Sequence, residues 1–374
     1  MKILQISNFF PPKTSGHGIY CYNLSMKLVE RGFHVKVITS QIPRNTPPIE
    51  LKNGIEIERI PAYGTGWGIS ALSFIVPKLL KEAKSFDVVH LHSYLFLISN
   101  QAALSKKLAK FPLVLHLHGG VGIPDPKFVG TFKSAFKRFY DNSIGKATIK
   151  SADRIISISK TDRVNVANKF KIERDKLVWI PNAIDISRFP YLEKKSTKNI
   201  GFIGRLELWK GVSYLPQIIR EISMRLPNTK LIIIGDGSQR ESLAAQSKGL
   251  PVEFFGRIPH KDITNIFRKI DVLILPSLLE GVPNVCLEAF SSGVPVVAFN
   301  VGGVKEIVKQ DKTGFLIQPG DTKEFIRKTL ILLKDTDLRH KMAKAGRKLV
   351  EKNYTWDVTT PKIISIFETL QTLE

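Results

Sequence analysis

Two glutamates, Glu280 and Glu288, stand on either side of a segment that can start a helix, because Pro283 and Asn284 are typical helix-start residues. The unpaired N–H groups of a helix N-terminus bind phosphate and other anionic oxygens. Carboxylates accept hydrogen bonds from the hydroxyls of a ribose or a hexose. These groups predict a ligand that is both anionic and polyhydroxylated, such as a nucleotide sugar. The alternative is a solvated loop carboxylate at Glu280 and a helix-dipole partner at Glu288.

Two short runs, residues 271–275 and 295–299, flank this segment, and they are apolar except for Asp271. Continuous apolar runs of this length are typical of parallel strands that are buried on both faces. The chain between them predicts a polar loop and then a helix over 285–290 that Gly293 ends. Ligands of open parallel sheets bind beyond the carboxyl ends of the strands, so both glutamates are expected at that edge.

Two cations, Arg205 and Lys210, follow another apolar run, residues 200–204. Cations just beyond a strand end can hold a diphosphate through charge-assisted hydrogen bonds, each worth about 1.5–3 kcal/mol. The alternative is a pair of surface cations on a solvated loop.

The stretch 280–298, EGVPNVCLEAFSSGVPVVA, and the Gly302, Gly303 and Glu306 that follow it resemble the signature of the retaining glycosyltransferases of family 4. The resemblance extends over most of the chain. It implies an α/β protein of GT-B architecture, with two doubly wound, Rossmann-like domains that face each other across a cleft.

The expected domains follow from this architecture. We predict an N-terminal acceptor-side domain over 1–190 and a C-terminal nucleotide-sugar domain over 191–354. A last helix, within 355–374, is expected to cross back to the first domain. A polar linker over 194–198 marks the start of the second domain.

The resemblance also implies a reaction. A sugar would pass from a nucleoside diphosphate sugar, with UDP or GDP as the expected nucleotide, to a hydroxyl acceptor with retention of the anomeric configuration. Arg205 and Lys210 would neutralise the departing diphosphate. Glu280 would orient the donor sugar, and His118 would contact it near the reacting carbon. No other cofactor is expected.

Donor-binding roles are implied for residues around the start of the predicted helix. Glu288 would bind the ribose diol. The backbone N–H groups of three residues would cap phosphate or sugar oxygens: Asn284, Val285 and Cys286.

Near the N-terminus, residues 3–39 predict a βαβ unit whose loop contains Gly16 and Gly18. Glycines here would let the backbone approach a ligand at the start of the helix. Family 4 enzymes usually have a Gly-Gly pair in this loop, facing the donor phosphates and the acceptor. The insertion of His17 between the two glycines departs from that pattern.

Four histidines lie on two predicted strands: His90, His92, His116 and His118. Two His-x-His pairs place imidazoles on the same face of a strand, which is compatible with zinc. No Cys or acidic cluster accompanies them, and histidines at strand ends also line crevices without metal. We therefore predict no metal site, and an enzyme whose cations are Arg205 and Lys210.

The formal charge of +23 is uneven, since residues 1–190 contain 28 Lys and Arg against 13 Asp and Glu. Such an excess favours nucleic acid, acidic lipid or phosphorylated substrates. No nucleic-acid motif is present, so we predict no nucleic-acid partner, although a nucleic-acid-binding protein remains a rival hypothesis. A hydrolase or epimerase that acts on the same nucleotide sugars is the rival among enzymes.

The stretch 124–140 places Phe128, Phe132, Phe136 and Phe139 at helical spacing among Lys127, Lys133, Lys137 and Arg138. Such a stripe fits a core helix or an interfacial helix equally well. From the interfacial alternative we predict reversible docking on an anionic membrane surface and a lipid-linked acceptor, as in the synthesis of lipid-linked glycans, polysaccharides or glycolipids. No signal peptide and no apolar run of about 18 residues is evident, so we expect a cytoplasmic protein that is peripheral to the membrane.

Overall fold

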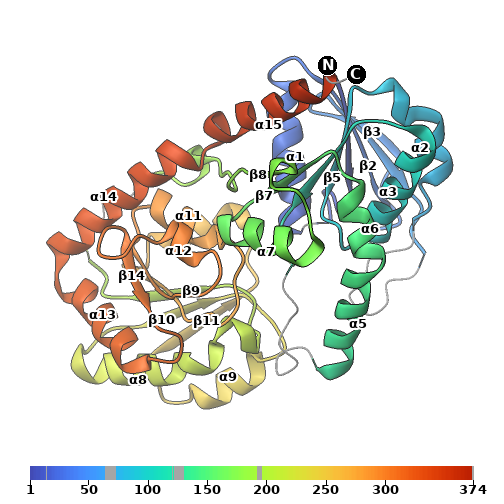
Figure 1. Cartoon of the computed structure of the whole chain (residues 1–374). Helices are drawn as coiled ribbons and strands as arrows, with labels where there is room; N and C mark the ends of the chain where they lie inside the picture. Colours follow the sequence, from blue (N-terminus) through green and yellow to red (C-terminus); the bar gives the residue numbers. More distant parts are fainter. Residues whose placement is uncertain (14, 64–72, 120, 122–129, 192–195, 373–374) are drawn as a thin grey trace. The chain divides into compact units, whose positions relative to one another are not determined.

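The computed structural model describes residues 1–13, 15–63, 73–119, 121, 130–191 and 196–372. The chain forms two compact units (Figure 1). The first unit contains Met1–Pro181 and Trp356–Glu374, and the second contains Asn182–Thr355. Each unit is a sheet with helices on both faces, so the two doubly wound α/β domains that the sequence predicts are confirmed.

The sheet of the first unit has the strand order β3-β4-β2-β1-β5-β6-β7-β8, and β3 is its antiparallel member. The chain runs outward from β1 and then returns to β5 on the other side of β1. This reversal is a topological switch point, where ligands of such sheets bind. The strands are β1 (Lys2–Ser7), β2 (His34–Ser40), β3 (Ile49–Lys52), β4 (Ile55–Ile60), β5 (Val88–His92), β6 (Leu113–Leu117), β7 (Arg154–Ser157) and β8 (Leu177–Trp179).

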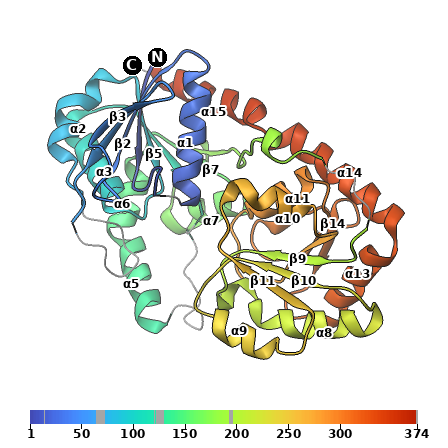
Figure 2. The same cartoon turned by 180° about the vertical axis from the view of Figure 1, so that it is seen from behind.

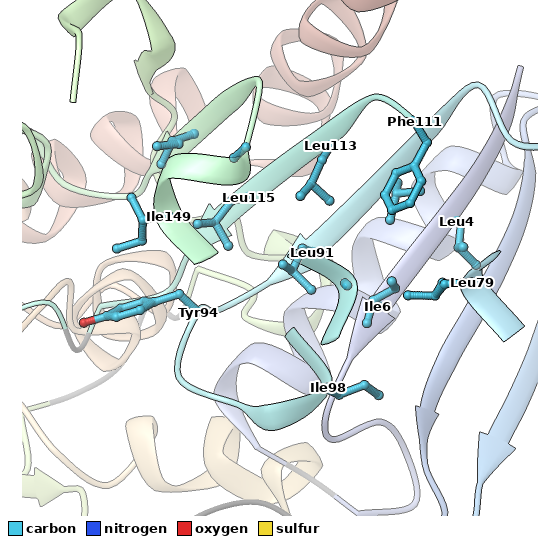
Figure 3. Close-up of a cluster of buried hydrophobic side chains, with 14 of the residues drawn as sticks. Leu4, Ile6, Leu79, Leu91, Tyr94, Ile98, Phe111, Leu113, Leu115 and Ile149 are labelled. Carbon is cyan, nitrogen blue, oxygen red and sulfur yellow. The ribbon is translucent and has the colours of Figure 1, made fainter. Parts of the chain in front are cut away.

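The main apolar core of the first unit lies on one face of this sheet (Figure 3). Leu4, Leu91 and Leu115 project from neighbouring strands toward residues of α2, α3 and α6. On the opposite face α15 lies beside α1 (Figure 1 and Figure 2). No described helix is long and apolar enough to cross a bilayer. The helices are α1 (Gly16–Val29), α2 (Val76–Glu82), α3 (Leu97–Ala109), α5 (Thr131–Asn142), α6 (Ile144–Ser151), α7 (Lys160–Phe170) and α15 (Trp356–Gln371).

The second unit is a parallel sheet of order β11-β10-β9-β12-β13-β14. Its strands are short apolar runs with a core on each face, as continuous apolar strands require. The strands are β9 (Ile200–Ile203), β10 (Leu231–Ile234), β11 (Val252–Gly256), β12 (Val272–Leu275), β13 (Val296–Phe299) and β14 (Gly314–Ile317). The helices are α8 (Leu215–Arg225), α9 (Arg240–Gln246), α10 (Ile263–Phe267), α11 (Asn284–Ser291), α12 (Val304–Ile307), α13 (Thr322–Lys334) and α14 (Thr336–Asn353).

The chain passes from the first unit to the second between Pro181 and Asn182, before the boundary predicted at 190. The residues after Pro181 already bond within the second unit. The N–H of Ile184 donates to the carbonyl of Tyr354 at 2.8 Å, and Phe189 is buried in one of the second unit's cores. The last helix, α15, belongs to the first unit. Lys194 and Lys195 of the predicted linker lie outside the described residues.

Candidate functional site

The loops that follow β9 and β12 are locked together at the carboxyl edge of the second sheet. Gly211 has a φ of +67°, and a Cβ there would lie 1.7 Å from the carbonyl oxygen of Pro276. The N–H of Leu278 donates to the carbonyl of Trp209 at 2.8 Å. Only glycine allows this approach of the two backbones. The loop that carries Arg205 and Lys210 is therefore held against the loop that carries Glu280.

A second glycine contact fixes Glu280 from the other side. Gly302, in the loop after β13, has a φ of +50°, and a Cβ there would lie 1.9 Å from the carbonyl oxygen of Glu280. The N–H of Gly303 donates to the carbonyl of Gly281 at 2.9 Å. The Gly-Gly pair of the motif thus supports the backbone of the first motif glutamate.

Lys210 and Glu280 form an ion pair, with 2.7 Å between Nζ and Oε1. Their side chains are 19% and 7% exposed. An ammonium group has three donors, so Lys210 can orient Glu280 and still donate to a phosphate oxygen. The structure therefore brings together two residues to which the sequence assigned separate roles.

Arg205 lies in the same loop as Lys210 and is exposed. Its guanidinium group is 5.2 Å from the centre of the Trp209 ring, a cation–π contact that orients it. Within the described part of the chain it makes no ion pair with a carboxylate. Its planar set of donors is therefore available for an anionic ligand.

The N-terminus of α11 offers fewer free N–H groups than predicted. The N–H of Cys286 already donates to the carbonyl of Pro283 at 3.0 Å. Among the described residues no acceptor is found for the N–H groups of Asn284 and Val285. These two groups remain available to a ligand, and Cys286 does not. Burial raises the pKa of the Cys286 thiol well above its usual value, so the thiol is also unsuited to be a nucleophile.

Two side chains that the sequence analysis did not single out contact the predicted site residues. His260 Nε2 lies 2.9 Å from Oε1 of Glu288, which is 11% exposed. Asn182 donates through Nδ2 to Oδ1 of Asn284 at 2.8 Å. Both contacts join residues far apart in the sequence, and no local pattern of charge or spacing marks them.

In the first unit His118 follows β6, two residues after His116, which the parallel register of β5 and β6 pairs with His92. His92 Nδ1 is 3.0 Å from His118 Nε2, and His92 Nε2 is 2.7 Å from Oε1 of Gln5. Burial, and then the neighbouring imidazoles, lower the pKa of His92 and His118 well below the usual value. Both rings are therefore neutral near pH 7 and can hydrogen-bond to a sugar without carrying charge.

Nitrogen atoms of His92, His116 and His118 lie within 4.8 Å of one another, close enough to raise the question of a metal. The rings of His116 and His118 are nearly parallel, at 9°, and those of His92 and His118 are at 13°. Ring nitrogens coordinate in the plane of the ring, and zinc needs them to converge at about 2.0–2.1 Å. The 3.0 Å between His92 Nδ1 and His118 Nε2 fits a hydrogen bond between neutral imidazoles, and we favour this arrangement over a metal site.

The two predicted glycines of the first unit differ in their surroundings. A Cβ at Gly18 would lie 2.5 Å from the carbonyl oxygen of Phe9, whereas no atom of the described residues lies within 4 Å of a Cβ at Gly16. The N–H of Gly18 donates to Oγ of Ser15 at 3.1 Å, so Ser15 caps the start of α1. Gly18 therefore packs α1 against the loop after β1. Of the two glycines, Gly16 is the one whose Cα has space for the approach of a ligand. Gly120, next to Gly119 after His118, lies outside the described residues.

Comparison with known proteins gives matches over nearly the whole chain. Residues 183–349 match the family model of glycosyl transferases group 1, and residues 14–188 match that of Glycosyltransferase Family 4. An uncharacterized glycosyltransferase of Methanocaldococcus jannaschii is 26% identical, with 98% of each chain covered. A sulfoquinovosyl transferase of Arabidopsis thaliana is 29% identical over 77% of this chain and 58% of its own length.

Solved structures resemble the whole chain. The sucrose-phosphate synthase from Thermosynechococcus elongatus has a TM-score of 0.81 at 19% identity, with 100% of each chain covered. HepE from Anabaena, in complex with UDP-glucose, has a TM-score of 0.75 at 20% identity, and covers 99% of this chain and 100% of its own.

Proposed function

The chain belongs to the family 4 glycosyltransferases, the group 1 glycosyl transferases, with their GT-B fold, and we propose that it retains the anomeric configuration while it transfers a sugar from a nucleoside diphosphate to a hydroxyl. The observation that carries this proposal is the Lys210–Glu280 pair, at 2.7 Å, in the same loop region as Arg205, which makes no ion pair with a carboxylate of the described residues. One edge of the second sheet thus offers two cations for a diphosphate and an oriented carboxylate for sugar hydroxyls.

The cations act on the leaving group. Negative charge grows on the diphosphate as the bond from the anomeric carbon to the phosphate oxygen breaks. Donors that are already in place stabilise this charge more in the transition state than in the ground state, which raises turnover. Arg205 and Lys210 fill this role without a metal ion in our proposal.

The remaining groups orient the donor. Glu280 accepts hydrogen bonds from the donor sugar, Glu288 accepts them from the ribose, and the N–H groups of Asn284 and Val285 donate to phosphate or sugar oxygens. The neutral ring of His118 contacts the sugar. The acceptor hydroxyl attacks from the face that the diphosphate leaves, its oxygen bonds to the anomeric carbon, and a phosphate oxygen takes its proton.

UDP is the first nucleotide to test, because the similar HepE structures contain UDP and UDP-glucose. GDP is the second. The assay below is designed to identify the sugar and the acceptor.

The test is a transfer assay with UDP- and GDP-sugars, run in EDTA, with lipid-extract and soluble-glycan acceptors. We expect a glycosylated product whose new bond has the anomeric configuration of the donor by NMR. Free sugar without product would favour a hydrolase, and an isomerised nucleotide sugar would favour an epimerase. Activity that EDTA abolishes and a divalent metal restores would contradict the role of the two cations.

Helix α5 supports a membrane-bound acceptor. Phe132, Phe136 and Phe139 are 67%, 44% and 67% exposed. At about 3.6 residues per turn they share one side of the helix, opposite the buried Ser134 and Asp141. The core-helix alternative is therefore wrong for these three residues. Phe128 and Lys127 lie outside the described residues.

Lys137 anchors this helix and does not face outward with the other cations. Its Nζ lies 2.5 Å from Oδ1 of the buried Asp141, which also pairs with Lys169 of α7. Burial lowers the pKa of Lys137, although Asp141 counteracts the effect. Lys133 and Arg138 remain exposed, one on each side of the phenylalanine stripe. Apolar residues flanked by cations are typical of a helix that lies in an anionic membrane surface.

We expect wild type to sediment with anionic vesicles of phosphatidylglycerol at low salt and not with neutral phosphatidylcholine vesicles. Replacing the three phenylalanines by serine should abolish sedimentation, and replacing Lys133 and Arg138 by serine should weaken it. The matched control replaces Ile49 and Leu51, which are 75% and 74% exposed on β3, by serine. A wild type that stays in solution with anionic vesicles, or a control that loses as much binding, would overturn the membrane role and leave a soluble acceptor.

A further inference from the structure

His260 lies between an arginine and the second motif glutamate. Its Nδ1 is 3.1 Å from Nη2 of Arg188, and its Nε2 is 2.9 Å from Oε1 of Glu288. All three residues belong to the second unit. They form a continuous hydrogen-bonded chain that ends on the carboxylate to which we assign the ribose.

The chemistry of arginine fixes the tautomer of the ring. A guanidinium group only donates hydrogen bonds, so Nδ1 of His260 must accept from Arg188. In the neutral ring the proton then lies on Nε2, which donates to Glu288. His260 is thus a directed donor to one carboxylate oxygen. The other oxygen, Oε2, has no partner among the described residues.

Side-chain contacts hold the segments that carry Arg188, His260 and Glu288 together. Thr264 donates through Oγ1 to the carbonyl of Arg188 at 2.7 Å. The ring of Phe189 lies edge-on to His260, with 5.7 Å between centroids. Arg347 donates to the carbonyls of Phe189 and of Ser291, at 3.0 Å each, which ties the Arg188 segment to the end of α11. The donor and the acceptor of the His260–Glu288 bond are therefore on elements that are joined to each other.

We propose that His260 is a positioning residue for recognition of the donor's ribose. Its Nε2–H holds Oε1 of Glu288 and so directs Oε2 toward the 2′- and 3′-hydroxyls, while Arg188 keeps the proton on Nε2. The inference rests on the proposed function, because it takes Glu288 as the ribose ligand. A carboxylate with one oxygen already bonded loses fewer rotamers when the ribose binds, and this raises affinity.

A purely structural His260 would act differently. It would join the segment before α10 to α11, and its loss would weaken binding of any ligand of this unit to the same extent. A positioning role predicts a loss that depends on the ribose hydroxyl.

The test is calorimetric titration with UDP, 2′-deoxy-UDP, GDP and 2′-deoxy-GDP. We expect wild type to bind the ribonucleotide at least about tenfold more tightly than its deoxy form, since a lost hydrogen bond to a charged group is worth about 1.5–3 kcal/mol. His260→Ala should reduce this ratio toward one by weakening the ribonucleotide alone. His260→Gln should restore much of it, because the amide N–H can replace Nε2–H. Arg188→Ala should lower it partially, and the exposed His340→Ala should leave it unchanged.

Different results would show failure of the positioning role and failure of the proposed function. Equal loss of affinity for the ribo- and deoxynucleotide in His260→Ala, or a wild-type ratio near one, would overturn the positioning role while nucleotide binding stands. Wild type that binds none of the four nucleotides would overturn the proposed function and this inference with it.

Discussion

At the scale of residues, the Lys210–Glu280 pair is both a functional and a structural element. Glu280 is 7% exposed, and a carboxylate so far removed from water is costly unless it is paired. We expect Lys210→Ala to lower kcat about 100- to 1,000-fold, as loss of one transition-state donor typically does. The same variant should unfold at a lower temperature, because it leaves Glu280 without its cation.

The double variant Lys210→Ala/Glu280→Gln separates these effects. The double variant has no unpaired carboxylate at position 280, so it should melt at a higher temperature than Lys210→Ala. It should not recover activity. Steady-state kinetics and calorimetric melting measure the two quantities. A Lys210→Ala enzyme with unchanged kcat would remove the role that we assign to this lysine.

The buried histidines of the first unit predict a pH-dependent stability. Burial lowers the pKa of His90 to about 3, whereas an unfolded histidine titrates at about 6.5. Between these values the unfolded chain binds a proton that folded His90 does not. Stability therefore falls as the pH falls below about 6.5, and this contribution is fully present above that pH.

We expect His90→Phe to weaken this dependence. Both ring nitrogens of His90 lack a hydrogen-bond partner in the described part of the protein, so phenylalanine removes a titrating group without breaking a described bond. The loss of unfolding free energy between pH 7 and pH 5 should be smaller by about 2 kcal/mol than in wild type. Urea unfolding at each pH measures it, and parallel pH profiles for the two proteins would show that His90 does not contribute.

At the scale of elements, glycines let the loops of the second sheet approach one another. We expect Gly302→Ala to lower both stability and turnover, because its Cβ would lie 1.9 Å from the carbonyl oxygen of Glu280 at a φ of +50°. Gly249→Ala is the matched control. It has a φ of +78°, but no atom in the described part of the chain lies within 4 Å of its Cβ, so it should bear only backbone strain of about 1–2 kcal/mol.

Melting temperature and kcat of the two alanine variants provide the measurement. Equal losses of stability in both, with turnover kept in both, would mean that the contact between Gly302 and the Glu280 loop does not position the site.

These elements also show what the sequence can predict. The strands of the second sheet were predictable because residues 272–275 and 295–299 are apolar throughout, which a strand covered on both faces requires. The helix that starts near Asn284 was predictable from its start residues. The sequence did not predict that Lys210 bonds to Glu280 or that His260 bonds to Glu288. These contacts depend on which strands are neighbours and on how the loops pack.

The exposed side of helix α5 also depends on tertiary contacts that the sequence pattern does not show. Its periodicity showed that the phenylalanines share a side, but it did not show whether that side packs against the rest of the unit. The buried Asp141 decides this, because it draws Lys137 inward and leaves the phenylalanines exposed. Local spacing therefore predicted the stripe, and tertiary ion pairing determined its direction.

At the scale of the whole molecule, the two units divide the chemistry and the charge. The cations and carboxylates of the proposed donor site are in the second unit. Most of the excess positive charge lies in residues 1–190, with 28 Lys and Arg against 13 Asp and Glu. The same stretch of the sequence contains the exposed phenylalanines of α5, which belongs to the first unit. The distribution supports a donor held by one unit and an anionic surface approached by the other.

The most direct test of the proposed donor site compares binding of nucleoside diphosphates with that of their monophosphates by calorimetry. If Arg205 and Lys210 hold the diphosphate, UDP or GDP should bind at least about tenfold more tightly than UMP or GMP, because each charge-assisted contact is worth about 1.5–3 kcal/mol. Arg205→Ala and Lys210→Ala should each bring the ratio closer to one. Equal binding of diphosphate and monophosphate by wild type, or a ratio that neither variant changes, would contradict the account.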